Sequence, residues 1–347
     1  MQPQPASEKI PYLTLAQVLS AVAVVFLHVN GCFWTFSTES WWASANVIEC
    51  VCFFAVPMFF MITGVTLIDY PARYDLKTYF RKRARKALLP FVVWSLIGLA
   101  YQCWRGAVSS DQITLPYVLR GLVQADIIPI YWFFPPLFSI YLSMPIFAAV
   151  PREKRKSVFG YLLAAAICVN VAIPFFITIL HIPVNWPLTV GAASGYLILV
   201  LGGVWLHENP PGRKLRLCLY LLGLAGLAAH ILGTWRLSMA AGEIVRTYKG
   251  YANLPNLMYT FALFVFLGRV GARVMASRCG ALVRAVGKYT LPIYLLHWFI
   301  LDTFERDLHV PVTALWYRLA APFVIVMIAM AITWLLRKIP GVRAIVP

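Results

Sequence analysis

The stretch LAQVLSAVAVVFLHVNG, residues 15–31, is apolar over almost its whole length, yet it contains Gln17 near one end and His28 near the other. An apolar helix of about 20 residues crosses the hydrocarbon core of a bilayer, so this stretch predicts a transmembrane helix. Polar side chains inside such a helix are costly and usually face a cavity or a partner. Because Gln17 and His28 are about three helical turns apart, they lie on one face, about 16 Å apart along the axis.

Composition extends this prediction to the whole chain. Of the 347 residues, 61% are hydrophobic and only 12% are charged, and the mean hydropathy is +0.75. Soluble domains carry roughly 25% charged residues. We therefore predict an all-α, polytopic integral membrane protein, a single membrane domain over residues 1–347 with about ten transmembrane helices. The polar start has no basic segment and no cleavage site, so the first span is expected to be retained. The spans are predicted near 12–34, 44–68, 87–104, 130–150, 157–180, 186–206, 215–235, 252–271, 289–304 and 312–336.

The basic residues alternate from loop to loop along these spans. The side that holds the N-terminus carries 23 of the 30 Lys and Arg residues, and the other side carries seven. This asymmetry follows the positive-inside rule and predicts that both termini are cytoplasmic. The net charge of +17 is thus explained by topology and does not indicate a nucleic-acid partner. The seven Cys residues show no spacing typical of a metal site or a disulfide framework, so no metal is expected.

One predicted cytoplasmic loop is more basic than topology requires. The segment RYDLKTYFRKRARKALLP, residues 73–90, holds seven basic residues with interleaved aromatic residues. Juxtamembrane clusters of this kind commonly contact anionic lipids. The alternative is a site for a multiply phosphorylated ligand, because Lys and Arg on one segment match several phosphates.

Three ionisable residues are expected at one depth near the outer side of the membrane. His28 lies about six residues below the outer end of the first span, Glu49 lies about six residues into the second, and His297 lies about seven residues below the outer end of the ninth. Trp132 begins the fourth span in the same layer. A carboxylate beside a histidine is typical of a general base. The alternatives are helix-to-helix hydrogen bonds for the histidines and a neutral, structural role for Glu49.

At these residues the chain resembles the membrane-bound acyltransferase 3 family. It is most similar to the surface-polysaccharide O-acetyltransferase branch, which includes the enterobacterial common antigen O-acetyltransferase. His297 matches the C-terminal Ile-Tyr-Leu-x-His element of the family, and His28 matches the His of its first-span motif, in which Arg precedes His. Gln17 stands at the position of that Arg, and Phe53 stands where relatives often carry a second Arg. The matching stretches are VVFLHVNGCFW, VPMFFMITG, FRKRARKALLPFVVW, YWFFPPLFSIYLSMPIF and VGKYTLPIYLLHWFI.

The resemblance implies transfer of an acyl group, commonly acetyl, from cytoplasmic acyl-CoA to a hydroxyl of a lipid-linked or exported glycan. It implies a multi-pass protein of the bacterial inner membrane with acyl-CoA, the glycan and membrane lipids as partners and no permanently bound cofactor. His28 is expected to act as base, with Glu49 to orient it and His297 to support it. Donor contacts are expected from Gln17, Arg81, Arg83, Arg85 and Lys86, and acceptor contacts from Asn30, Thr63, Trp132 and Tyr294.

Two other functions remain open from the residues alone. A transporter or flippase for a lipid-linked or acidic solute would use the embedded groups as a proton relay. A homologue that has lost catalysis together with the Arg of the first-span motif is the other alternative. Saturable binding of acyl-CoA from the cytoplasmic face is expected of an acyltransferase and not of a carrier.

Overall fold

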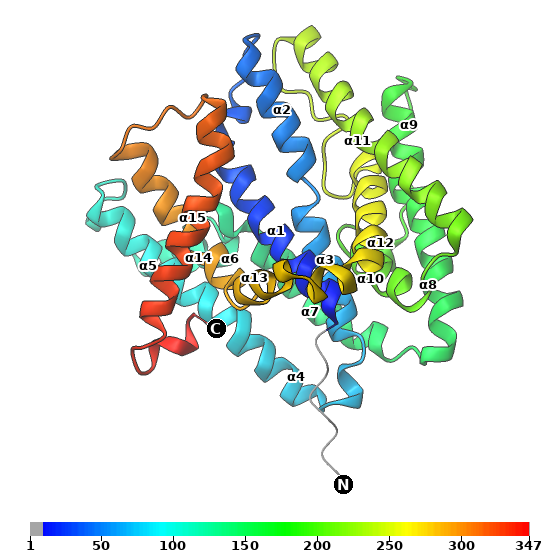
Figure 1. The fold of residues 1–347 in the computed structure, drawn as a ribbon, viewed down its shortest axis with the longest axis horizontal. Coiled ribbons are helices and arrows are strands. Elements are labelled where there is room, and N and C mark those ends of the chain that lie inside the picture. Colours follow the sequence, from blue (N-terminus) through cyan, green and yellow to red (C-terminus); the bar gives the residue numbers. More distant parts are fainter. Residues whose placement is uncertain (1–9, 347) are drawn as a thin grey trace.

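The structure, a computed structural model, describes residues 10–346, and every regular element within that range is helical. Figure 1 shows the helices as a bundle around α1. The α-helices are α1 (Pro11–Val29), α2 (Ser40–Cys52), α3 (Ala55–Leu67), α4 (Leu76–Arg83), α5 (Leu89–Trp104), α6 (Leu115–Gln124), α7 (Phe134–Ala148), α8 (Arg152–Ala166), α9 (Ile173–Ile179), α10 (Leu197–Glu208), α11 (Arg213–Ala241), α12 (Leu254–Ala276), α13 (Arg278–Val286), α14 (Thr290–Arg306) and α15 (Leu315–Leu336). The short 3-10 helices are η1 (Gly31–Trp34), η2 (Tyr70–Ala72), η4 (Ser110–Gln112), η5 (Pro129–Phe133), η7 (Gly191–Ala193) and η8 (Val342–Ala344), and the π-helical turns are η3 (Ala84–Leu88) and η6 (Ile167–Ala172).

Eight helical stretches within residues 10–346 are long and apolar enough to cross a membrane. They are Pro11–Val29, Ser40–Ala72, Leu76–Trp104, Pro129–Ala148, Arg152–Ile179, Arg213–Ala241, Leu254–Ala276 and Leu315–Leu336. The chain is therefore a multi-pass helical membrane protein. Two predicted spans, 186–206 and 289–304, correspond to α10 and α14, which have 12 and 17 residues and are shorter than the ~20 residues of a full crossing.

Two of these stretches are irregular where a proline enters them. Pro57 has no N–H to donate to the carbonyl of Phe53, and its ring would clash with that carbonyl in a regular helix. The second stretch accordingly breaks between α2 and α3 at Phe53 and Phe54. In the third stretch the π-helical turn η3 stands directly before Pro90, so the basic segment continues into α5 through a widened turn.

The helices pack closely where small residues meet a neighbouring backbone. α1 lies in the centre and contacts α2, α3, α12, α13, α14 and α15. α3 and α10 pack against each other through Gly64 and Gly203. A Cβ atom added to Gly203 would lie 2.5 Å from the carbonyl oxygen of Met61. Small residues at such crossings allow membrane helices to gain van der Waals contact without a hydrophobic driving force.

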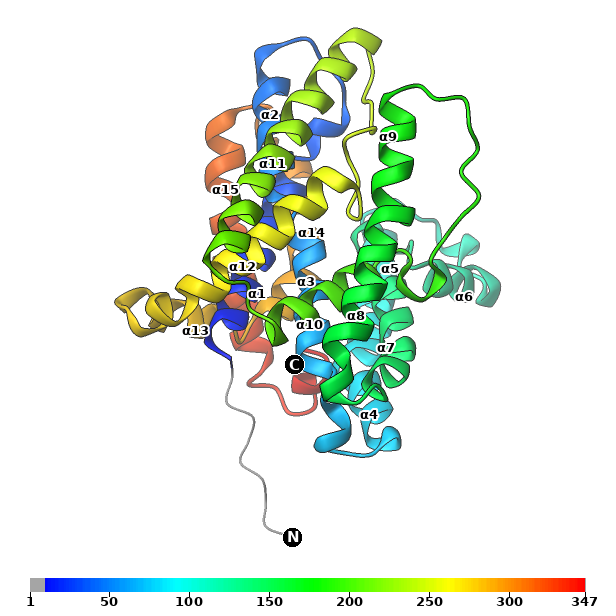
Figure 2. The ribbon, with the colours of Figure 1, turned by 90° about the vertical axis from the view of Figure 1, so that its right-hand side faces the viewer.

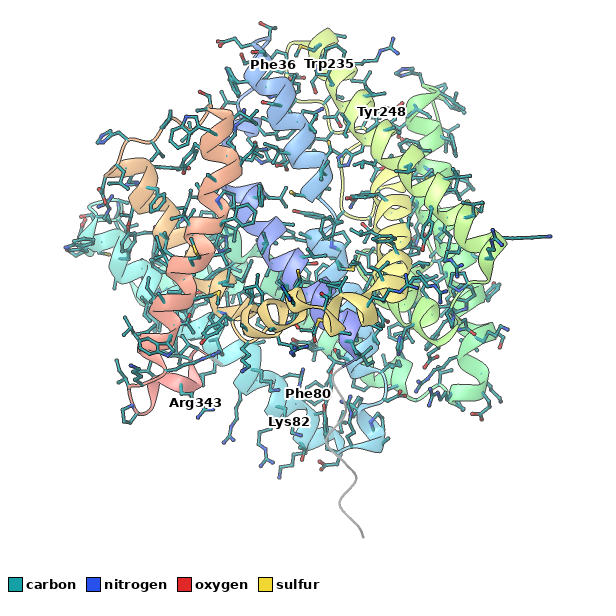
Figure 3. The ribbon with its side chains drawn as sticks, in the orientation of Figure 1. Phe36, Phe80, Lys82, Trp235, Tyr248 and Arg343 are labelled. Carbon is teal, nitrogen blue, oxygen red and sulfur yellow. The ribbon has the colours of Figure 1, made fainter. Side chains whose placement is uncertain are left out.

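The two ends of the bundle differ in character. The start of α1 and the end of the chain after α15 lie toward the lower end in Figure 1, and α13 lies crosswise near that end in both Figure 1 and Figure 2. Figure 3 shows Lys82 and Arg343 at the lower end and Phe36 and Trp235 at the upper end. α1 therefore runs from the lower end, near Gln17, toward the upper end, near His28.

Candidate active site

His28 and His297 lie side by side in the upper half of the bundle. Their ring centroids are 5.0 Å apart, although α1 and α14 are far apart in the sequence. His297 is fully buried, and its Nδ1 atom lies 3.0 Å from the carbonyl oxygen of Ile293. Since a carbonyl oxygen only accepts, this Nδ1 atom carries a proton and donates. The Nε2 atom of His297 has no hydrogen-bond partner within the described residues.

His28 lines a cavity of about 310 Å³ whose walls are largely apolar, with both aromatic and aliphatic side chains. The aromatic residues come from four different segments and are Trp34, Trp132, Phe133, Tyr251 and Tyr294. Trp132 stacks on Tyr251 with ring centroids 5.3 Å apart, and Tyr251 stacks in turn on Phe53 at 4.3 Å. Apolar walls with a few polar groups are typical of a small-molecule site. We call this space the upper cavity.

Glu49 also lines the upper cavity, but its partner is not His28. The Nζ atom of Lys249 donates to Oε1 of Glu49 at 2.8 Å, and both side chains are only 2% exposed. The sequence predicts Glu49 as the group that orients His28, and within residues 10–346 no hydrogen bond joins the two. Lys249 is not predicted from the sequence, although it is one of the few basic residues assigned to an outer loop, which was a usable signal.

The predicted acceptor residues divide into two groups. Trp132 and Tyr294 line the upper cavity with His28. Asn30 is fully buried, and both polar atoms of its side chain are hydrogen-bonded within the protein. Its Nδ2 atom donates to the carbonyl of Ala45, and its Oδ1 atom accepts from Arg318. Thr63 donates to the carbonyl of Phe59 and does not line the upper cavity.

Gln17 lines a second, larger space of about 870 Å³ toward the lower end, which we call the lower cavity. Its Nε2 atom donates to Oγ1 of Thr290 at 2.7 Å, which links α1 to the start of α14. The cations that line the lower cavity are Arg73, Arg284 and Lys288. One face of α1 thus connects a basic cavity at Gln17 with an aromatic cavity at His28.

A protein-family model described as an acyltransferase domain matches residues 10–338. This chain belongs to the acyltransferase 3 family. No curated protein and no solved structure matches it. The protein is therefore a membrane acyltransferase.

The basic residues that the sequence predicts for the donor lie outside both cavities of this acyltransferase. Arg81 and Arg83 belong to α4, and Arg85 and Lys86 belong to η3. All except Arg83 are exposed, and the guanidinium of Arg83 lies 5.7 Å from the ring centroid of Tyr141. The cations that line the cavity at Gln17 are instead Arg73, from the start of the same basic segment, and Arg284 and Lys288.

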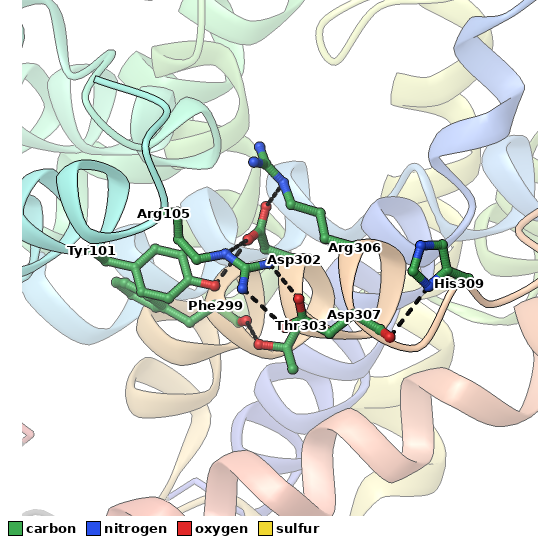
Figure 4. A network of polar contacts seen from close by, with 8 residues as sticks. All are labelled: Tyr101, Arg105, Phe299, Asp302, Thr303, Arg306, Asp307 and His309. Atoms are coloured by element: carbon green, nitrogen blue, oxygen red, sulfur yellow. Dashed lines mark hydrogen bonds and ion pairs between the residues drawn. The ribbon is translucent and has the colours of Figure 1, made fainter. Parts of the chain in front are cut away.

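A polar network fixes the acyltransferase helix that carries His297. Figure 4 shows the upper ends of α5 and α14 joined through Tyr101, Arg105, Asp302 and Asp307. The hydroxyl of Tyr101 donates to Asp302 at 2.9 Å, and Arg105 forms a two-pronged ion pair with Asp307 at 2.8 and 3.1 Å. Two-pronged guanidinium pairs restrict geometry strongly. The network therefore limits sliding of α14 against α5, five residues beyond His297.

Proposed function

We propose that this acyltransferase moves an acetyl group from acyl-CoA to a hydroxyl of a lipid-linked or exported surface glycan, as in the surface-polysaccharide O-acetyltransferase branch. The observation that carries the proposal is that one face of α1 lines a basic cavity at Gln17 and an aromatic cavity at His28. The arm of CoA between phosphates and thioester is about 15–20 Å long, comparable with the ~16 Å of helix rise from Gln17 to His28.

The proposed topology places the lower end in the cytoplasm and the upper end outside. The excess of Lys and Arg on the side that holds the N-terminus supports this orientation. With α10 and α14 counted as crossings beside the eight longer stretches, the chain has ten spans and both termini are cytoplasmic. The proposed location is the inner membrane of a bacterium.

In the proposed reaction His28 is the general base. A ring nitrogen of His28 takes the proton of the acceptor hydroxyl while the oxygen attacks the thioester carbonyl. The carbon–sulfur bond breaks, and the CoA thiolate takes the proton from the His28 imidazolium, so that ester and free CoA are the products. His297 packs against His28 and supports its ring. The largely apolar walls of the upper cavity disfavour water, which would limit hydrolysis of the thioester.

The phosphates of the donor are assigned to the lower cavity. Arg73, Arg284 and Lys288 surround it, and guanidinium and ammonium groups match phosphate oxygens. The exposed cluster Arg81, Arg83, Arg85 and Lys86 is the second candidate for these phosphates and otherwise faces anionic lipid headgroups. Acyl-CoA is a substrate in this scheme, with no permanently bound cofactor, and the partners are the glycan and membrane lipids and no nucleic acid.

The proposal is tested by acetyl transfer in purified membranes. The donor is labelled acetyl-CoA, and the acceptor is the glycan fraction of cells that lack the protein. Replacing His28 by Ala is expected to lower transfer by at least about 100-fold, the range of general-base catalysis. Transfer unchanged in His28→Ala would remove the proposed role. Wild-type membranes that move a lipid-linked glycan but bind no acetyl-CoA would instead identify a carrier.

A further inference from the structure

Glu49 places a carboxylate oxygen without a partner at the upper cavity. Its Oε1 atom accepts from Lys249, whereas its Oε2 atom is buried and has no hydrogen-bond partner among the described residues. Glu49 itself lines the cavity together with His28. A buried acceptor is costly unless a donor meets it. We therefore expect the molecule that occupies the cavity to donate a hydrogen bond to this oxygen.

Lys249 is committed to holding this carboxylate. Its Nζ atom lies 3.6 Å from the ring centroid of Phe53, 4.9 Å from that of Phe33 and 5.2 Å from that of Trp34. A desolvated ammonium over aromatic faces is attracted to them, and the ion pair with Glu49 compensates its charge. The rings and Glu49 thus fix the position of the ammonium, and the ammonium fixes the position of the carboxylate.

The remaining walls describe the chemistry of the occupant. Aromatic faces, from Trp132 stacked on Tyr251, suit the C–H face of a saturated ring. The ionisable groups other than tyrosines that line the cavity are His28 and Glu49, and no Lys or Arg is among its described lining residues. A carboxylate or phosphate inside this space would meet Glu49 without a free cation to balance it. A neutral ring with several hydroxyls matches all of these features.

We propose that Glu49 binds a second hydroxyl of the acceptor, distinct from the hydroxyl that reacts at His28. Lys249 is the positioning residue that holds Glu49 for this contact. The acceptor unit that enters the upper cavity is then a neutral, polyhydroxylated ring. This inference rests on the proposed function and differs from a role of Glu49 in orienting His28.

The test separates acceptor binding from chemistry. The double variant Glu49→Leu/Lys249→Met removes both charges, and replacing a buried ion pair by apolar groups commonly preserves folding. With labelled acetyl-CoA and the glycan fraction of cells lacking the protein, we expect the KM for the glycan to rise at least about tenfold, equivalent to about 1.4 kcal/mol. The KM for acetyl-CoA and the kcat are expected to stay within about threefold of the wild type. Arg236→Met is the control, since Arg236 is an exposed cation of α11 that lines neither cavity.

Each other result decides against the inference in a different way. An unchanged KM for the glycan would make the ion pair purely structural. A fall in kcat at unchanged KM would mean that Glu49 acts through His28. Mass spectrometry that finds the acetyl group on a sugar unit bearing a carboxylate or phosphate would overturn the substrate class. Full transfer by His28→Ala, or no transfer by the wild type, would instead remove the proposed function.

Discussion

At the scale of single residues, one hydrogen bond orients the ring of His297. Its Nδ1 atom donates to the carbonyl of Ile293, and its Nε2 atom has no hydrogen-bond partner among the described residues. The bond to Ile293 holds the His297 ring against that of His28. This arrangement explains why two histidines share one layer of an apolar bundle.

Replacing His297 by Ala should therefore lower kcat about tenfold or more, because His28 loses the ring that packs against it. The KM for acetyl-CoA should stay unchanged, since His297 lines neither cavity. Both constants are measured with labelled acetyl-CoA. Thr333→Ala is the control, because Thr333 is equally buried but lies on α15 and lines neither cavity. Equal losses in the two variants would point to general destabilisation.

Gln17 is the residue at which this chain departs from its family's first-span motif. It lines the lower cavity, and its amide is bonded to Thr290. Gln17→Arg should lower the KM for acetyl-CoA about tenfold, because one hydrogen bond to a charged group contributes about 1.5–3 kcal/mol. Gln17→Met, which keeps the length but loses the bond to Thr290, should not lower it. No change with Arg would place the donor away from Gln17.

At the scale of elements, proline-induced irregularities shape the site. The break before Pro57 ends α2 one turn after Glu49 and leaves Phe53 to stack on Tyr251 and to lie under Lys249. Non-helical backbone inside a membrane protein is tolerated where protein surrounds it or where it lines a cavity. The break therefore positions Phe53 beneath Lys249, and Lys249 holds the carboxylate of Glu49 at the upper cavity.

The close contact of α3 with α10 predicts a steric effect. Gly203→Ala should destabilise the protein by about 1–3 kcal/mol, since the added methyl meets the backbone of Met61. Gly268→Ala on α12 adds the same methyl where no atom lies within 4 Å. That control should be neutral or stabilising by up to about 1 kcal/mol. Thermal unfolding in detergent compares the two, and equal midpoints would contradict the packing.

The lower cavity also predicts which basic element binds the donor. Arg284→Ala/Lys288→Ala should raise the KM for acetyl-CoA at least about tenfold, by loss of two cations around the phosphates. The matched pair Arg81→Ala/Arg85→Ala should change it by less than about threefold. Saturation curves at low and high salt would measure both, because screening weakens exposed charge contacts most. The opposite ranking would assign the donor to α4 and η3.

At the scale of the whole molecule, charge and cavities follow one axis. Lys82 and Arg343 lie at the lower end (Figure 3), the cavity with three cations lies toward that end, and the upper cavity lies toward the other. The proposed transfer, from a cytoplasmic donor to an acceptor on the other side, would use this polarity along α1.

The proposed orientation predicts the fate of reporter fusions. Green fluorescent protein fused after the C-terminus should fluoresce, and alkaline phosphatase at the same place should be inactive, because the C-terminus is cytoplasmic under the positive-inside rule. Alkaline phosphatase fused within the loop after Ala241 should be active. The reverse pattern would invert the topology and exchange the donor and acceptor ends.

Comparing depth along the predicted spans places His28, Glu49, His297 and Trp132 in one layer. His28, Glu49, Trp132 and Tyr294 were all predicted as functional, and the structure brings all four to one cavity. The sequence alone does not identify Lys249, because the position of a loop relative to the membrane does not show which of its side chains folds back between the helices. The predicted donor contacts on α4 and η3 line neither cavity, whereas Arg73, from the start of the same basic segment, lines the lower cavity with Arg284 and Lys288.

The sequence by itself determined the membrane class, the helical fold and the face shared by Gln17 and His28, because hydropathy and the 3.6-residue period are local properties of the chain. Only the tertiary structure decided that Glu49 pairs with Lys249, that His297 meets His28, and that Gln17 bonds to Thr290. These partners lie about 200 to 270 residues apart in the chain, so only the packing of the helices brings them together.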